Sequence, residues 1–435
     1  MYVADQYRVP MREMLKLNIE SFGRRPSLWR YHDRAARREI TSKIQAKSGK
    51  RFIFPLPSGY VKAGTGPNIK RTSAYQLWAT ATFDGQYNVA QDIGLNDLTY
   101  ETSVGAFKDQ FSDGVGEAFA NILDERFAEG LTEAQWMVVF NPADPGRSMQ
   151  QVASKFRRYG IMGTGAKKPN LAVSDNVMDS LDYYKANAVR EDSVASFSNK
   201  FNVVESNQDI PDYLTGDRAG LCPVVYGGCQ SGCKIIVDFG ADGANRLVAY
   251  AGEVIEFEGV QGIIVRTQKR TGQRQQFRVE RDIWTDSNGL ASVLIYDHLR
   301  PQNQSAIIGE NHYGQDIHTD AHANATQSPD DGARVHISPG LKANTRYEQS
   351  IAWMDNMITL VTPPAAKGAL MGAERMAIRV KEGGSISDLA NLVYSVSLDT
   401  DHGPTETHRL DMHLDVLTKQ RELGVRLVGP ELGAI

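Results

Sequence analysis

Three cysteines lie within twelve residues near the middle of this 435-residue chain and are the first candidates for chemistry. Six residues separate Cys222 from Cys229, and three separate Cys229 from Cys233. Two cysteines that bind one zinc ion usually have two residues between them. A metal site would need a fourth ligand from His312, His318 or His322. The simpler interpretation is a tight glycine-rich turn, YGGCQSGC, whose small residues include cysteine. We favour the turn and expect no cofactor.

A second group of potential metal ligands lies between residues 399 and 408. It contains Asp399, Asp401, His402 and His408, which combine carboxylates with imidazoles. We predict a turn between two strands here, where charged side chains are common because turns face solvent. The segment DTDHG is also too short for a calcium-binding EF-hand loop. We therefore favour a solvated turn over a metal site.

The sequence lacks the motifs of common enzymes. Residues 163–168 (GTGAKK) and 240–246 (GADGANR) are rich in glycine but do not have the frame of a phosphate-binding loop. Neither HExxH nor GxSxG occurs. A pair of catalytic carboxylates can always be drawn from 52 acidic residues, but nothing in the sequence brings two together. We predict that the chain is not an enzyme. The alternative is a β-rich polysaccharide-processing enzyme or carbohydrate-binding protein.

Composition narrows the class of protein. The length allows two or three domains with a large core. The formal net charge of -4 argues against a general nucleic-acid binder. No apolar run is long enough to span a bilayer, and MYVADQYRVPMREML lacks the apolar core of a secretory signal. With three cysteines, a disulfide framework is not expected. We expect a globular protein of a reducing cytoplasm with no membrane partner.

Residues 1–50 are predicted to form an arm. Ten Lys or Arg stand against two acids between Arg24 and Arg51. Such a run is often only a solvated face. The alternatives are contact with DNA phosphates and docking of an acidic partner. The arginines concerned are Arg24, Arg25, Arg30, Arg34, Arg37 and Arg38.

Residues 51–86 are predicted to form an extended loop. Two aromatic-rich strand patterns flank a tip that contains Gly and Pro. An isolated hairpin is marginally stable in water, so neighbouring structure must support this one. This support comes either from the same chain, as in an ordinary surface hairpin, or from an adjacent subunit, which is what the resemblance described below implies. The predicted contact residues are Phe52, Ile53, Phe54, Tyr60, Lys62, Lys70, Arg71, Tyr75 and Trp78.

Residues 98–130 show the clearest helical periodicity. The apolar positions recur every three or four residues and are Val104, Phe107, Phe111, Val115, Ala118, Phe119 and Ile122. About thirty residues would make a rod of about 45 Å. Gly105, Gly114 and Gly116 would allow such a rod to bend.

The rest of the chain alternates strands and helices before it becomes rich in strands. A buried strand at 136–141 precedes a helix at 147–159, with Asp144 as cap and Pro145 in the first turn. A strand from residue 170 leads, through a Ser174 or Asp175 cap, to a helix ending near Leu181, which suits an α+β layer. Four turns, at 242–243, 258–259, 271–272 and 288–289, predict a small β-barrel over 215–340. Residues 312–331 are polar and are predicted to form a mobile loop.

Two blocks of sequence resemble the coat proteins of short-tailed, double-stranded-DNA bacteriophages. Residues 352–429 contain AWMDNMITLVTPP, MAIRVKEGGSISDLANLVYSVSLD and HRLDMHLDVLTKQRELGVRLVG, which match the carboxy-terminal pattern of that family. Residues 252–301 resemble its inserted domain, through GEVIEFEGV and the later QQFRV. Glu253 stands where the family pattern has aspartate.

The resemblance implies an α+β phage capsid fold of the Hong Kong ninety-seven type with an inserted β-barrel. It implies these domains: N-terminal arm 1–50, extended loop 51–86, spine helix and peripheral domain 87–165, first part of the axial domain 166–214, inserted β-barrel domain 215–345, and the remaining axial and peripheral parts with the C-terminal strands 346–435.

The function that the resemblance implies is a self-assembling icosahedral head, first a procapsid and then a mature capsid. The implied partners are other copies in pentamers and hexamers, a scaffolding protein, a portal protein and packaged double-stranded DNA. A decoration protein is left open. The expected location is the virion, assembled in the host cytoplasm. The three helix glycines named above would act as a hinge during expansion of the shell.

Overall fold

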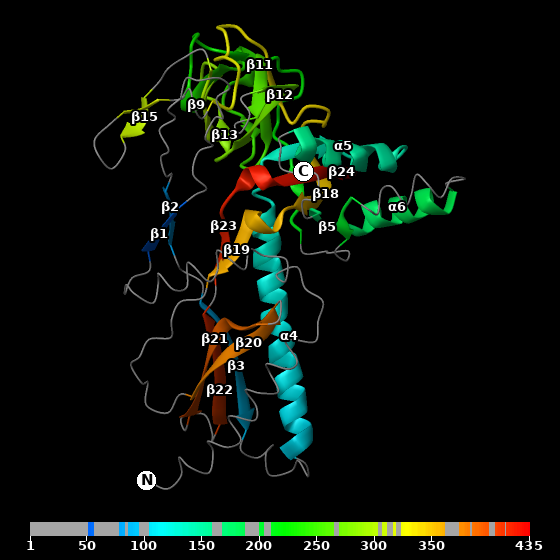
Figure 1. Ribbon diagram of the computed structural model, residues 1–435, viewed down its shortest axis with the longest axis vertical. Coiled ribbons are helices and arrows are strands. Elements are labelled where there is room, and N and C mark those ends of the chain that lie inside the picture. Colours follow the sequence, from blue (N-terminus) through cyan, green and yellow to red (C-terminus); the bar gives the residue numbers. More distant parts are fainter. Residues whose placement is uncertain are drawn as a thin grey trace, which may run out of the picture. The chain divides into compact units, whose positions relative to one another are not determined.

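The structure is a computed structural model, drawn in Figure 1. The described residues are 51–55, 78–82, 86–94, 104–158, 168–187, 200–203, 210–264, 269–302, 307–310, 316–318, 323–361, 374–382, 385–399, 405–413 and 415–435. The predicted arm lies outside them. The chain divides into two compact units. The first comprises Met1–Phe54, Thr80–Gly130 and Ile358–Lys419, and the second comprises Pro55–Ala79, Leu131–Met357 and Gln420–Ile435.

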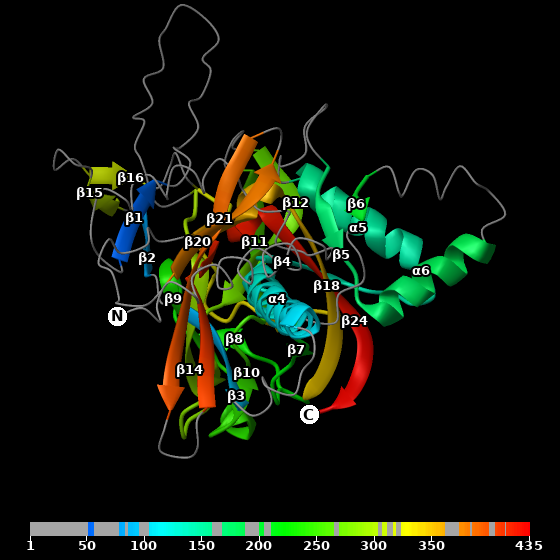
Figure 2. The same ribbon diagram turned by 90° about the horizontal axis from the view of Figure 1, so that it is seen from below.

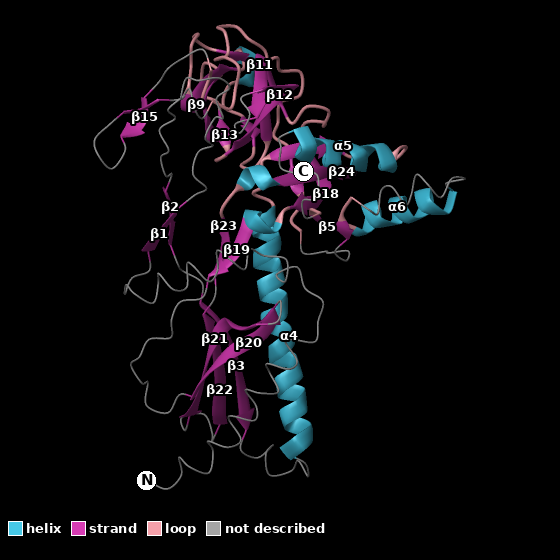
Figure 3. Ribbon diagram, viewed as in Figure 1, coloured by secondary structure: helices cyan, strands magenta, loops and turns pink. Residues whose placement is uncertain are grey.

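The first unit combines a long helix with antiparallel strands (Figure 3). Helix α4 is Val104–Leu131, and its last residue is assigned to the second unit. A four-stranded sheet has the order β20 (Glu374–Glu382), β21 (Ser385–Asp399), β22 (Thr405–His413) and β3 (Gln86–Gly94). A separate ladder joins β19 (Ile358–Val361) to β23 (Asp415–Thr418). The Thr418 hydroxyl donates a hydrogen bond of 3.0 Å to the carbonyl of Gly130, so this ladder contacts the end of α4.

Helix α4 confirms the long helix that the apolar period predicts. Its 28 residues correspond to about 42 Å at about 1.5 Å each. Phe119, Leu123 and Phe127 are nearly fully buried and recur every four residues, whereas Ala118 and Ile122 are half-buried. The buried stripe therefore passes through Leu123 and Phe127, which the sequence analysis did not single out.

The second unit is built around a mixed sheet. Its strand order is β4 (Trp136–Val139), β24 (Gly424–Ala434), β18 (Thr345–Trp353), β5 (Asn170–Ala172) and β6 (Asn202–Val203). β24 runs parallel to β4 and antiparallel to β18, and Figure 2 shows β18 and β24 side by side. The short strand β7 (Tyr213–Leu214) also pairs with β18. Helices and mostly antiparallel sheets together make the α+β class that the sequence predicts.

Two helices contribute to the apolar core on this sheet. Helix α5 (Pro145–Arg158) begins as predicted, because the Asp144 carboxylate accepts a hydrogen bond of 3.0 Å from the amide of Arg147. Helix α6 (Asp175–Asn187) extends beyond the predicted end at Leu181, since its sequence contains no Gly or Pro that would stop it. The shared core includes Trp136, Phe140, Met149, Val152, Phe156, Leu171, Val177, Leu181, Ala352 and Leu427.

A second sheet in this unit closes on itself. Its order is β17 (Val335–Ile337), β11 (Val254–Ile264), β12 (Lys269–Val279), β14 (Leu290–Leu299), β9 (Gly232–Asp238) and β8 (Val224–Val225). A bridge between Val224 and Arg334 joins the last strand to the start of the first. The amide of Val335 also donates to the carbonyl of Pro223 at 2.9 Å. We call this the closed sheet. Beside it, β10 (Leu247–Ala249) pairs with β13 (Ile283–Trp284).

The interior of the closed sheet is apolar. It includes Val225, Ile235, Val237, Ile255, Phe257, Phe277, Val279, Val293, Ile295 and Val335. These residues come from all six strands, so burial of their side chains drives closure.

Two of the four predicted turns are irregularities inside strands. Residues 258–259 lie within β11, and 271–272 lie within β12. The pairing register shifts around both positions, and Gly259 and Gly272 have φ of 79° and 73°. A glycine with positive φ serves a bulge as well as a turn, so the dipeptide alone does not distinguish them. The pair 242–243 falls in a short 3-10 helix, Ala241–Gly243.

The turn at Asn288–Gly289 is confirmed. Gly289 has φ of 81°, and its amide donates to the Asp286 carbonyl at 3.1 Å. The Asp286 carboxylate accepts further hydrogen bonds from the amides of Asn288 and Leu290. The hydrogen bonds within the turn come from neighbouring residues, which explains why the sequence reveals it.

The predicted mobile loop at 312–331 is wrong for its second half. Ala323, Asn324 and Ala325 are buried, and Ala325 belongs to the interior of the closed sheet. The amide of Ile263 donates to the Asn324 carbonyl, and the Asn324 side chain accepts from the amide of Arg300, both at 2.9 Å. Within 312–331, the structure also describes a strand, β16 (Asp316–His318), which pairs with β15 (Ile307–Glu310). The polar composition hid these positions because the hydrogen bonds of Asn324 are made with residues distant in the sequence.

No helix among the described residues is both long and apolar enough to cross a membrane.

Replacing Phe257 or Phe277 by alanine should lower the free energy of unfolding by about 3 to 5 kcal/mol. Both side chains are 0% exposed, and their ring centroids lie 6.0 Å apart inside the closed sheet. Chemical denaturation followed by circular dichroism would measure the loss. Trp284→Ala is the control, because that side chain is 63% exposed, and a change within about 0.5 kcal/mol is expected. Equal losses in all three variants would contradict the assignment of this interior.

Candidate functional site

The predicted interface residues lie mostly outside the described residues. This holds for the arm arginines, Arg24, Arg25, Arg30, Arg34, Arg37 and Arg38, and for Tyr60, Lys62, Lys70, Arg71 and Tyr75. Phe52 and Phe54 lie in β1 (Arg51–Pro55), and Trp78 begins β2 (Trp78–Thr82), with which β1 pairs. Gly105, Gly114 and Gly116 all lie inside the uninterrupted helix α4. The roles of these residues stay predictions.

The two candidate metal clusters are placed only in part. Cys222, Cys229 and Cys233 are free and exposed. His318 lies in β16, whereas the other two candidate histidines lie outside the described part of the chain. The turn predicted around residues 399–408 is shorter than expected: Asp399 ends β21, and His408 lies inside β22 opposite Val396. Within the described ranges, no three His, Cys, Asp or Glu side chains are grouped as a metal would require.

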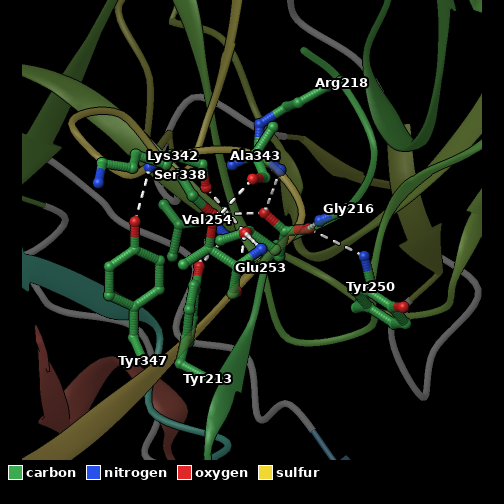
Figure 4. Close-up of polar contacts among 12 residues, drawn as sticks. Tyr213, Gly216, Arg218, Tyr250, Glu253, Val254, Ser338, Lys342, Ala343 and Tyr347 are labelled. Carbon is green, nitrogen blue, oxygen red and sulfur yellow. Dashed lines mark hydrogen bonds and ion pairs between the residues drawn. The ribbon is translucent and has the colours of Figure 1, made fainter. Parts of the chain in front are cut away.

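The most developed polar site that the structure describes is centred on Glu253, at the start of β11 (Figure 4). The side chain is 1% exposed, and its carboxylate accepts four hydrogen bonds. One oxygen accepts from the amides of Gly216 and Tyr250, at 2.8 and 3.0 Å. The other accepts from the Arg218 guanidinium and the Ser338 hydroxyl, both at 2.7 Å. This buried charge is therefore fully satisfied, as its burial requires.

Local backbone geometry brings these groups together. Gly216 lies very close to the backbone of Val248. A Cβ at position 216 would lie 2.3 Å from the carbonyl carbon of Val248, and only glycine avoids this clash. Ser338 has φ of 41°, in the left-handed region, and its amide donates to the carbonyl of Val254 at 2.7 Å. A strained conformation at Ser338 directs its hydroxyl to the carboxylate.

Tyr213 extends this network into the mixed sheet. Its hydroxyl lies 2.6 Å from the Ser338 hydroxyl and accepts a hydrogen bond of 3.2 Å from the amide of Val254. The single hydroxyl hydrogen of Ser338 is donated to Glu253, so the hydroxyl of Tyr213 must be the donor to Ser338. Burial raises the pKa of Tyr213, an effect that the nearby Arg426 charge opposes. Neutral Tyr213 thus links β7 to the closed sheet.

A second polar contact joins β12 to β4. The side chain of Gln135 donates to the carbonyl of Gln276 at 3.0 Å, and the amide of Met137 donates to the Gln276 side chain at 2.9 Å. The Gln276 amide nitrogen in turn donates to Glu256 at 2.9 Å. These hydrogen bonds fix β12 of the closed sheet against the edge strand of the mixed sheet.

Arg421 makes the third contact. Its guanidinium lies 2.8 Å from Glu133 and 2.5 Å from Glu280, and it stacks 4.0 Å above the ring of Tyr296. Burial by itself lowers the pKa of Arg421, but the charges of Glu133 and Glu280 more than offset this, so that the pKa is raised. The arginine stays charged and joins the two sheets through Glu280 and Tyr296.

The chemistry of this site is binding and orientation. Its hydrogen bonds are directional and surround an apolar patch formed by Met137, Tyr213, Val254, Tyr347 and Val428. Apolar burial alone would allow the sheets to slide, whereas the polar contacts select one arrangement. We call this set of contacts the junction of the second unit.

Sequence reasoning missed the junction. Glu253 was noted only as a replacement for aspartate, and Arg421 only as part of a motif. One signal was present for Glu253, because GEVIEF places two carboxylates in an otherwise apolar run. Such a charge must find a buried partner, but the partner's identity is not local information.

No family model and no curated protein matches the chain. The structure is similar to a solved structure from Mycobacterium phage Che8, with 8% identity, 91% of this chain and 89% of that chain covered, and a TM-score of 0.42. It is also similar to the capsid structure of the cyanophage P-SCSP1u, with 11% identity, 88% of this chain and 84% of that chain covered, and a TM-score of 0.36. A third similar structure is the CUS-3 coat protein I-domain, with 15% identity, 27% of this chain and 94% of that chain covered, and a TM-score of 0.18. At these TM-scores we base the proposed function on the sequence blocks and on the described geometry.

Glu253→Gln should lower the free energy of unfolding by about 3 to 5 kcal/mol, because it leaves the buried Arg218 without its charged partner. The Arg218 and Glu253 side chains are 9% and 0% exposed. A double-mutant cycle with Arg218→Gln should show that the two losses are not additive. Arg346→Gln breaks an exposed pair with Asp212 and should cost at most about 1 kcal/mol. Additive losses at Glu253 and Arg218 would argue against the junction.

Proposed function

We propose that this chain is the major capsid protein of a short-tailed, double-stranded-DNA bacteriophage, with the Hong Kong ninety-seven type fold and an inserted domain at residues 215–345. It would assemble into an icosahedral procapsid that matures into the head. The two sequence blocks that carry the resemblance support this. In the structure, the block at 252–301 spans β11 to β14, and the block at 352–429 contributes to β18 and β24.

The observation that carries the proposal is the point where the chain leaves the mixed sheet and returns to it. Tyr213 and Leu214 of β7 pair with Tyr347 and Arg346 of β18. The amide of Thr215 donates to the carbonyl of Thr345 at 3.1 Å. The closed sheet thus begins and ends at adjacent positions of a host sheet. An inserted domain would require such an arrangement, so this pairing supports the inserted domain that the resemblance implies.

A shell protein needs many weak contacts with copies of itself. A closed shell repeats the same interfaces, so that each contact can be weak while the assembly is stable. An extended loop at 51–86 and an arm at 1–50 would reach neighbours that a compact surface could not. Each Å² of apolar surface they bury would contribute about 25 cal/mol. Nothing in the described residues favours the polysaccharide-processing alternative.

The remaining partners follow from the same proposal. A scaffolding protein, a portal protein and packaged double-stranded DNA would meet the inner surface, where the basic arm would contact either scaffold or phosphates. A decoration protein is left open. In a maturing head, Gly105, Gly114 and Gly116 would let α4 bend as the shell expands.

Purified chain mixed with its scaffolding protein should form closed particles of uniform size. Negative-stain electron microscopy would show them, and analytical ultracentrifugation would measure the fraction assembled. The chain without scaffold is the control, and it should give fewer or irregular particles. A folded monomer at every concentration, with scaffold or without, would contradict the proposed function.

Deleting residues 63–69 should leave a folded monomer that forms no shells, because the tip of the extended loop could no longer reach an adjacent copy. The matched control replaces the same seven residues by a Gly/Ser segment of equal length, which keeps the reach and removes the side chains. Circular dichroism would verify folding, and microscopy would score shells. Normal shells from the deletion variant would refute the role of the loop.

A further inference from the structure

A cavity of about 170 Å³ lies at the junction of the second unit. Residues of the mixed sheet and of the closed-sheet region both line it, among them Tyr213, Gly252, Arg278, Asp282, Gln349 and Arg426. Two of these are arginines, one on β12 and one on β24. The contacts that orient the two sheets do not use either guanidinium.

Arg426 is a buried cation without a hydrogen-bonding partner in the described structure. It is 1% exposed, and both its Nε and its Nη2 are buried and unpaired. The guanidinium carbon lies 5.2 Å from the centre of the Tyr213 ring, which provides only a weak attraction. Burial, more than any other cause, lowers the pKa of Arg426 to about 10, so the group is still protonated at neutral pH. An unpaired buried charge of this kind is unfavourable unless something in the cavity compensates it.

Arg278 converges on the same place from the closed sheet. Its Nε is also buried and unpaired among the described residues. A Cβ built on Gly252 would lie 3.6 Å from Nη2 of Arg278 and 3.7 Å from Nη1 of Arg426, so both guanidinium groups approach this glycine. Burial and the charge of Arg421 lower the pKa of Arg278. Two like charges that converge on one glycine disfavour each other's charged form, and an anion between them would offset this.

The carboxylates around the cavity have other partners. Glu253 already accepts its four hydrogen bonds, and none comes from either arginine. Asp212 pairs with Arg346 at 2.5 Å, and Asp282 accepts from the amide of Ala251 at 2.8 Å. Asp282 is thus the one lining carboxylate without a printed cationic partner, and the cavity holds two arginines against this single acid.

We propose that this cavity is a binding site for a small oxyanion, inorganic phosphate, held between Arg278 and Arg426. The guanidinium fork matches the spacing of phosphate oxygens, and the unused N–H groups would be satisfied by it. The amide nitrogen of Gln349 donates to the Pro211 carbonyl, which leaves its Oε1 buried and unpaired. This oxygen can accept only from a donor, and protonated phosphate carries one whereas sulfate does not.

Bound phosphate would connect β12 to β24 and so reinforce the junction. The site does not depend on the proposed capsid function, because it follows from groups inside one chain. Loss of phosphate binding would therefore leave that function untouched, and failure to form shells would leave this site untouched.

Isothermal titration of the unassembled full chain with inorganic phosphate at neutral pH tests the site, with chloride matched for ionic strength. Saturable binding of one phosphate per chain is expected. Arg278→Gln and Arg426→Gln should each raise the Kd by about 10- to 100-fold. Arg274→Gln is the matched control, since Arg274 lies on the same strand, is exposed and does not line the cavity, and its Kd should stay unchanged.

The proposal would be overturned if the wild-type chain showed no saturable binding of phosphate. It would also be overturned if both cavity variants bound phosphate with the affinity of the wild-type chain. Should Arg426→Gln fail to fold, the half-buried Arg278 decides the test. Sulfate provides a second measurement: weaker binding than phosphate is expected because of Gln349, and equal binding would contradict the role of that side chain.

Discussion

Burial of one negative charge constrains the arrangement of the second unit. The Glu253 carboxylate has no access to solvent, so it has to be satisfied within the chain. Its partners come from the segment that leaves the mixed sheet, from the turn between β10 and β11 and from the segment that returns, at Gly216, Tyr250 and Ser338. Displacing any one of these segments would remove one of the hydrogen bonds that the buried carboxylate needs. The closed sheet is thereby held where the chain connects it to its host.

Apolar and polar contacts have different roles at the junction. The patch around Met137 and Val254 removes hydrocarbon from water but imposes little direction. Gln276 and Arg421 add hydrogen bonds and ion pairs that are satisfied in only one orientation. In the proposed shell this matters, because each of many identical copies must present the same surface to its neighbours. An orientation that varied from copy to copy would not close a shell.

Charge is distributed unevenly across the same junction. Glu253 and Arg421 have ion-pair partners, whereas within the described part of the chain Nε of Arg278 and both Nε and Nη2 of Arg426 have no hydrogen-bond partner. A fold stabilised by its own contacts alone would be expected to neutralise or expose such arginines. Their persistence around a cavity is the reason for assigning them a small oxyanion, which would make the orientation of the closed sheet responsive to the solution around it.

The sequence by itself determined the features that depend on near neighbours. Helix α4, the Asp144 cap of α5 and the Asn288–Gly289 turn each follow from residues within a few positions. The resemblance to phage coat proteins likewise came from contiguous blocks.

Tertiary structure alone decided the closure of the strands, the two bulges and the junction. Glu253 finds its partners 35, 37 and 85 residues away, apart from Tyr250 close by, and no local pattern encodes such pairings. Polar composition misplaced Asn324 for the same reason, since its burial depends on Ile263 and Arg300. Hydrogen bonds and buried charges are satisfied in space, whereas propensity and periodicity act along the chain, and that difference separates the two sets of features.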